Sequence, residues 1–222
     1  MKEKYFTSES SLEVSKAILS EVHTVTRRRE IDLLLSETAL LVLDMQHYFF
    51  DESSHAFIPS MKGIIENIRN LEGLFSDSHR LIILTRHLNT PEDAGLMKIW
   101  WNGLVEKENV SSRLIEEIAV PDSIIIDKTK YDAFFDTDLE EILKNNNIKN
   151  LIICGVMTHL CCETTARSGF MHGFNIFFTV DGTATYNKKF HLSTILNLSH
   201  GFAIPVLIPE LIEYILKRGS NE

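Results

Sequence analysis

The stretch LIICGVMTHLCCETTARSGF, residues 151–170, passes from a short apolar run into a longer segment of mixed polarity. Strands that are covered by helices on both faces read as continuous apolar runs, because both of their faces are buried. The same pattern occurs at five other places: ALLVL at 39–43, LIIL at 81–84, SIII at 123–126, IFFTV at 176–180 and AIPVL at 203–207. This alternation predicts a mostly parallel sheet with helices on both sides.

Amphipathic helices are expected between these strands and before the first of them. Apolar residues recur at helix spacing at Ile64, Ile65, Ile68 and Leu71, at Leu139, Ile142 and Leu143, and at Leu192, Ile195 and Leu196. Val14, Ile18, Val22 and Val25 likewise line one face of a helix. We expect one domain over residues 1–222, in which an N-terminal helical arm (1–38) packs on the core (39–217) or on a partner subunit.

Composition narrows the classes of partner. The formal net charge is -9, so the chain repels phosphate backbones and anionic lipid, and nucleic acid is not an expected partner. Because no apolar run approaches the roughly 20 residues of a membrane span and the first residues are polar, we expect a cytoplasmic protein that does not bind membranes. The three cysteines lie within nine positions of one another and offer no long-range disulfide framework.

Chemically active side chains follow three of the predicted strands, at the sheet edge where open α/β folds bind ligands. Asp44 follows the first strand, Lys128 the third, and Cys161 stands in the first turn of the helix after the fourth. The positive end of a helix dipole favours a thiolate there. Each residue also has a plainer interpretation: Asp44 as a helix cap, the lysine as a solvated charge and the cysteine as a small buried hydrophobe.

Three short motifs carry a resemblance to a known superfamily. They are D-M-Q at 44–46, K-x-x-Y-x-A-F at 128–134 and G-V-x-T-x-x-C at 155–161. The chain resembles the isochorismatase-like cysteine hydrolases from about residue 39 to 207. The resemblance implies a three-layer α/β/α Rossmann-like fold, in which six parallel strands, numbered along the chain, lie in the order 3-2-1-4-5-6.

The resemblance also implies a role for each matching residue. Asp44 is expected to be the base and acid, Lys128 the charged partner, and Cys161 the nucleophile. The family's turn before the cysteine contains a non-proline cis peptide, which falls here between Val156 and Met157. It is expected to aim the N–H groups of Met157 and Cys161 at one point as an oxyanion hole.

The family contains members with different chemistry. Its nicotinamidases bind a metal through an Asp-x-His pair after the second strand, where this chain has Thr85 to Asn89, TRHLN. We therefore expect no metal and no other cofactor, which disfavours nicotinamide as the substrate. Vinyl-ether-cleaving isochorismatases lack the cysteine, so the presence of Cys161 favours hydrolysis of an amide, ureide or carbamoyl C–N bond through a thioester. The alternatives are isochorismate cleavage and a non-catalytic binding protein on the same fold.

The substrate is expected to be a small molecule. Its binding residues are predicted to be Phe49, Trp101, Tyr131, Phe134 and His159, because aromatic walls near the strand ends suit a planar ligand. Core packing is the alternative for the aromatic residues among them. Relatives with this fold commonly form dimers or tetramers, so a homo-oligomer is expected as well.

Overall fold

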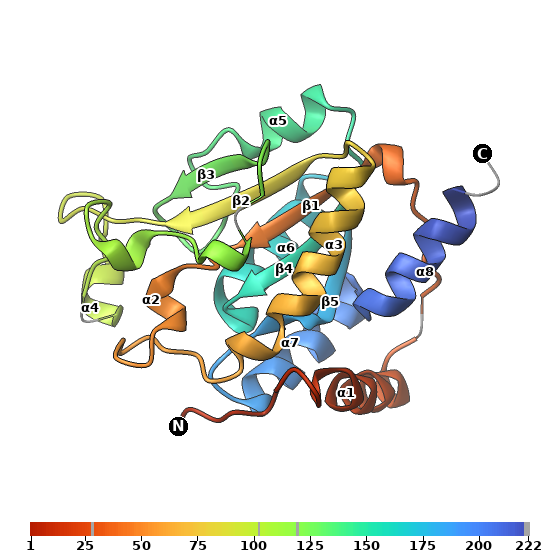
Figure 1. Ribbon diagram of the computed structural model, residues 1–222, viewed down its shortest axis with the longest axis horizontal. Coiled ribbons are helices and arrows are strands. Elements are labelled where there is room, and N and C mark those ends of the chain that lie inside the picture. Colours follow the sequence, from red (N-terminus) through yellow and green to blue (C-terminus); the bar gives the residue numbers. More distant parts are fainter. Residues whose placement is uncertain (28, 102, 119, 220–222) are drawn as a thin grey trace.

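The computed structural model describes residues 1–27, 29–101, 103–118 and 120–219. Six strands form one parallel sheet in the order β3-β2-β1-β4-β5-β6 (Figure 1), which confirms the predicted order. They are β1 (Thr38–Leu43), β2 (Ile82–His87), β3 (Ile124–Lys128), β4 (Asn150–Val156), β5 (Asn175–Ala184) and β6 (Ile204–Val206). The order reverses between β1 and β4, which pair directly.

Several strands continue past the apolar runs that predicted them. β2 extends to His87, β3 to Lys128, and β4 through Gly155 to Val156. β5 continues to Ala184, with a register shift opposite Ile153 and Gly155 of β4. Polar side chains are therefore held on rigid strand ends at the carboxyl edge of the sheet.

Helices cover both faces of this sheet, as expected. On one face α3 (Ile65–Asp77) contacts β1, β2 and β5, and α8 (Ile208–Gly219) contacts β5. On the other face α6 (Glu163–Met171) and α7 (Lys188–Gly201) contact β5 and each other. The arrows of β1 to β4 point toward the side where α2 (His47–Phe50) and α4 (Met97–Trp101) lie (Figure 1).

The N-terminal arm packs on the core of its own chain. Its helix, α1 (Ser11–Val25), contacts β5 and α7, and Ile18 and Val22 are fully buried. Before it, the N–H groups of Tyr5 and Phe6 both donate to the hydroxyl of Ser60. The helix face predicted from the sequence is thus the buried face, except that Val25 at its end is exposed.

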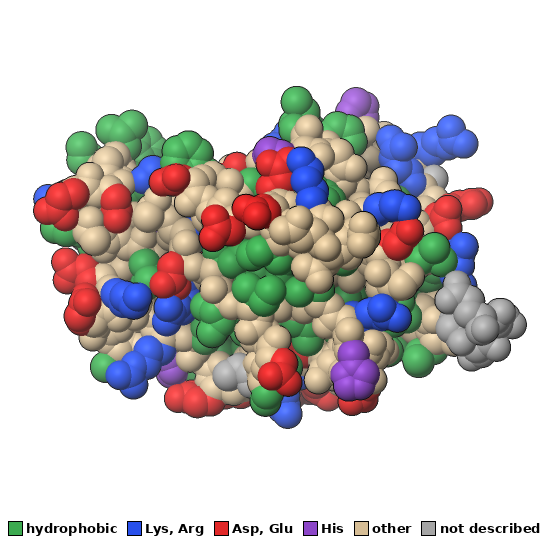
Figure 2. All heavy atoms as spheres, turned by 90° about the horizontal axis from the view of Figure 1, so that it is seen from above, with side chains coloured by type: hydrophobic (Ala, Val, Ile, Leu, Met, Phe, Trp, Pro, Cys, Tyr) green, Lys and Arg blue, Asp and Glu red, His purple; other side chains and the backbone are tan. Residues whose placement is uncertain are grey.

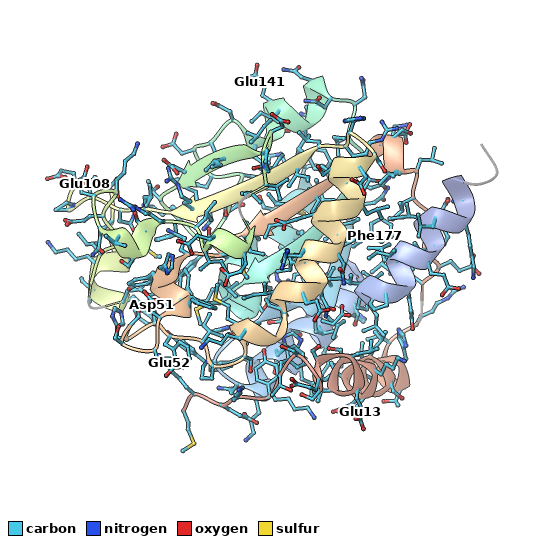
Figure 3. All side chains as sticks on the ribbon, in the orientation of Figure 1. Glu13, Asp51, Glu52, Glu108, Glu141 and Phe177 are labelled. Carbon is cyan, nitrogen blue, oxygen red and sulfur yellow. The ribbon has the colours of Figure 1, made fainter. Side chains whose placement is uncertain are left out.

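The remaining short elements are α5 (Leu139–Asn145), the 3₁₀ turns Leu35–Glu37, Met61–Gly63, Val110–Ser112 and Glu116–Ile118, and a π-helical turn, η5 (Thr158–Cys162). Phe177 of β5 points into the interior, while labelled acidic side chains such as Glu13 and Glu141 lie at the periphery (Figure 3). The face above the β3 edge mixes hydrophobic and charged side chains (Figure 2). Within the described ranges, no helix is long and apolar enough to cross a bilayer.

Candidate active site

Asp44, Lys128 and Cys161 meet at the carboxyl edge of the sheet. The Lys128 Nζ lies 2.7 Å from Asp44 Oδ2 and 3.4 Å from Cys161 Sγ. All three residues are buried, and neither the carboxylate nor the ammonium is exposed to solvent. The cluster spans 117 positions of the sequence, from Asp44 to Cys161, and it forms because β1, β3 and β4 all end at this edge.

The backbone holds Asp44 in one orientation. Its φ of 53° lies in the left-handed region, which Asp tolerates better than most side chains. The Thr85 hydroxyl donates to Asp44 Oδ1 at 2.6 Å, and the Asp44 N–H donates to Thr85 at the end of β2. Oδ2 is left facing Lys128, whose Nζ also donates to the Lys130 carbonyl at 3.0 Å.

The turn that carries Cys161 begins at a glycine that no other residue can replace without movement. Gly155 has a φ of +106°, and a Cβ there would lie 2.1 Å from the Leu43 carbonyl oxygen of β1. The next peptide, Val156–Met157, is cis, as the family resemblance led us to expect. The Met157 carbonyl then accepts the N–H groups of Leu160 and Cys162, which places Cys161 in η5 rather than in the first turn of α6.

Burial, not the helix terminus, controls the acidity of the thiol. Desolvation, which is opposed by the Lys128 charge and reinforced by the Asp44 carboxylate, raises the pKa of Cys161 to about 12. This reverses the expectation that the helix start favours a resting thiolate. The pKa of Lys128 is affected first by burial, which lowers it, but Asp44 and Cys161 outweigh burial and raise it above its ordinary value. A protonated thiol therefore faces a carboxylate that is paired with an ammonium.

His87 joins this cluster, although the sequence suggested only a turn residue. It ends β2, and one of its ring nitrogens, a carboxylate oxygen of Asp44 and Cys161 Sγ lie within 4.8 Å of one another. Its Nε2 pairs with Asn89 Oδ1 at 2.7 Å. Desolvation, followed by the nearby Lys128 charge, lowers the pKa of His87 to about 4, so the ring is neutral at pH 7.

A narrow cavity lies beside the thiol. Its walls include the residues Tyr48, Phe49, His87, Asn89, Met97, Trp101, Val105, Tyr131, Met157, Leu160 and Cys161. The indole N–H of Trp101 donates to the Tyr131 hydroxyl at 2.9 Å, which fixes one aromatic wall. Phe49, Trp101 and Tyr131 are thus placed where the sequence analysis expected substrate contacts. Tyr48, His87 and Asn89 were not among its candidates.

The structure places Phe134 and His159, the other two predicted binding residues, outside the lining of this cavity. The Phe134 ring stacks on His172 and Phe174. The His159 Nδ1 pairs with Thr185 Oγ1 at 2.6 Å, and its ring stacks on Phe190. Neither residue lines the cavity, because the turns that carry them point these rings into the surrounding packing.

The residue types of Asp44, His87 and Cys161 also raise the question of a metal. Such a site needs its ligand atoms to converge on one cation. Here the Lys128 ammonium already contacts Asp44 and Cys161, so two of the three possible ligands are already paired with a cation. The end of β2 supplies a single imidazole, that of His87, and its Nε2 is held by Asn89. The arrangement fits a proton-transfer centre and does not fit the metal site of the family's nicotinamidases.

Comparison with known proteins identifies the family to which the chain belongs. The chain is 39% identical over 184 residues to nicotinamidase 3 of Arabidopsis thaliana, covering 80% of this chain and 87% of that protein. It is 30% identical over 180 residues to enterobactin synthase component B of Escherichia coli, covering 78% of this chain and 62% of that protein. Its fold matches a cysteine hydrolase from Pseudomonas syringae pv. phaseolicola, with a TM-score of 0.83 at 22% identity, over 87% of this chain and 99% of that one. The isochorismatase domain model matches residues 38–210, and the chain belongs to the isochorismatase family of hydrolases.

Proposed function

We propose that this hydrolase cleaves the C–N bond of a small planar carboxamide, with Cys161 as the nucleophile. The observation that carries the proposal is the buried contact of Cys161 Sγ with Lys128, which is itself paired with Asp44. A thiol with a pKa of about 12 is a poor nucleophile at pH 7 unless a neighbouring base takes its proton. Asp44 is the carboxylate in place to do so.

The proposed reaction runs in two halves. Asp44 takes the Cys161 proton, and the sulfur attacks the amide carbon while the N–H groups of Met157 and Cys161 stabilise the oxyanion. Asp44 then donates the proton to the leaving nitrogen, and ammonia departs. Water hydrolyses the thioester and restores the thiol. The Lys128 ammonium stabilises whichever of the two partners is negatively charged, the Cys161 thiolate or the Asp44 carboxylate, because Coulomb attraction is strong in a buried site.

Nicotinamide is the first substrate to test. The similarity to a plant nicotinamidase supports it, and this changes the weight that the sequence analysis gave to the missing Asp-x-His pair. The aromatic walls Phe49, Trp101 and Tyr131 also suit a planar ring. Ureides and carbamoyl compounds share the scissile bond type and belong in the same substrate panel.

The test is ammonia release from nicotinamide and from this panel by the wild type and by Cys161→Ala. We expect Cys161→Ala to lose turnover and alkylation by iodoacetamide while keeping its far-UV circular dichroism. Cys154→Ala is the matched control, because Cys154 is buried within β4 and should leave turnover intact. Full activity in Cys161→Ala would reject the thiol mechanism. Pyruvate release from isochorismate by that variant would point to vinyl ether cleavage instead.

A further inference from the structure

A polar atom without a partner lies next to the proposed reacting groups. Among the described residues, the His87 Nδ1 is a buried side-chain nitrogen that makes no hydrogen bond. An unpaired buried polar atom of this kind is unfavourable, so its position needs an explanation. His87 also lines the cavity beside Cys161, where a reactant is able to supply the missing donor.

A chain of hydrogen bonds fixes which nitrogen of His87 carries the proton. The Asn89 amide nitrogen donates to Asp93 Oδ1 and to the Thr129 carbonyl, each at 3.0 Å. Both donor positions of that amide are therefore used, and Asn89 Oδ1 is left as an acceptor for His87 Nε2. The neutral ring must carry its proton on Nε2, which leaves Nδ1 as a bare acceptor.

The spacing of the cluster leaves a position for one small molecule. Three atoms within 4.8 Å of one another define a centre about 2.8 Å or less from each of them, which is a hydrogen-bond length. A water oxygen placed at that centre would lie within hydrogen-bond distance of the Asp44 carboxylate, a ring nitrogen of His87 and the sulfur of Cys161. After acylation, that sulfur carries the thioester carbon that water must attack.

We propose that His87 positions the hydrolytic water in the second half of the reaction, with Nδ1 accepting a hydrogen bond from it. The inference rests on the thioester mechanism proposed above. The water oxygen forms a bond to the thioester carbon, its other proton passes to Asp44, and the C–S bond breaks. The carboxylic acid leaves, and Asp44 returns its proton to the Cys161 sulfur. Fixing the direction of attack is the contribution of His87, since orientation alone is worth orders of magnitude in rate.

The experiment isolates this step with an ester probe. p-Nitrophenyl nicotinate acylates a thiol directly, so the burst of p-nitrophenolate reports acylation and the following steady state reports thioester hydrolysis. His87→Asn and His87→Leu form a nearly isosteric pair, and only Asn offers an oxygen close to the Nδ1 position. We expect His87→Leu to keep its burst and to slow thioester hydrolysis on the order of 10²-fold. His87→Asn should remain within about tenfold of the wild type, because it restores an acceptor.

Mass spectrometry of the intact protein provides a second readout. The nicotinoyl adduct should accumulate in His87→Leu and be scarce in the wild type. His159→Asn is the matched control, because His159 faces Thr185 outside the cavity and should behave as the wild type. Hydrolysis in His87→Leu as fast as in the wild type would overturn the proposal, and so would an equal loss in Asn and Leu. Cys161→Ala tests the proposed thiol mechanism separately from the role of His87. A missing burst in this variant would support the mechanism, and a retained burst would contradict it.

Discussion

Replacing Asp44 by Asn separates the two roles that the structure gives to this carboxylate. In the wild type it is the counter-ion of a fully buried ammonium, at 2.7 Å. Removing one partner of a buried ion pair typically costs about 3–5 kcal/mol, because the other charge stays buried. For a chain of this length that corresponds to a fall in Tm of roughly 6–20 °C. The second-site change Lys128→Met should recover most of this loss, since it removes the stranded charge.

The same substitution should make the thiol more acidic while it abolishes turnover. Asp44 raises the pKa of Cys161 and Lys128 lowers it, so without the carboxylate the ammonium acts alone on the thiol. Alkylation of Cys161 at pH 7 should therefore become faster in Asp44→Asn and slow again in Asp44→Asn/Lys128→Met. Turnover should fall on the order of 10⁴-fold, because general acid and base catalysis are both lost.

The assays are differential scanning fluorimetry, iodoacetamide labelling of Cys161 followed by mass spectrometry, and ammonia release. Loss of labelling when Cys161→Ala is added to each background confirms that the labelled thiol is Cys161. The reasoning is refuted if Asp44→Asn has both the Tm and the Cys161 labelling rate of the wild type. It is also refuted if the double variant is less stable than Asp44→Asn.

Three further predictions each concern the substitution of a single residue. Burial raises the pKa of Glu72 to about 8, so the wild type loses stability as pH rises from about 4.5 to 8, and Glu72→Gln should be more stable at pH 9 but not at pH 4 in urea unfolding. Gly155→Ala should unfold several degrees lower in calorimetry and lose turnover, because its Cβ meets the Leu43 carbonyl at 2.1 Å. Trp101→Leu removes the bond to Tyr131 and one cavity wall, so KM should rise about tenfold with a smaller change in kcat.

The fold was accessible from the sequence because its strands are apolar runs. The positions of all six were predicted, since burial on both faces leaves an unmistakable pattern. Their ends were not, because β2 and β3 continue to the polar residues His87 and Lys128, which are register partners in the sheet. The register shift between β4 and β5, near Gly155 of β4, was also not predicted, since it depends on contacts across the sheet.

The site residues that belong to a motif could be predicted from the sequence. Those whose side-chain direction depends on the path of the backbone could not. Asp44, Lys128 and Cys161 follow strands that end at one edge, so their convergence follows from the parallel topology. Phe134 stands six residues beyond Lys128, and nothing in its spacing tells that its ring turns to His172. Membership of His87 in the cluster was also missed. A signal was present in the TRHLN segment, where His and Asn stand two residues apart. The sequence of this segment does not distinguish a hydrogen-bonded His–Asn pair in a site from an ordinary turn.

Cys161 shows how an argument from one local effect can fail. The start of a helix stabilises a thiolate by a modest amount, whereas complete burial in this cluster acts on the thiol more strongly and in the opposite direction. The depth of a residue is a property of the whole fold. Sequence alone gives the direction in which the start of a helix shifts the pKa of the thiol. It does not give the size of the opposing shift that burial causes.

Lys128 is carried by β3, the outermost strand of the sheet, which hydrogen-bonds to a neighbour on one side only. The cation that binds both acids therefore sits on the part of the sheet with the least support. Local unfolding of β3 would pull the Lys128 ammonium away from Asp44 and Cys161 while the central strands stay folded. Catalytic competence would then be lost before the native state is, and slow amide exchange in β4 alongside fast exchange in β3 would reveal such a partly open, inactive form.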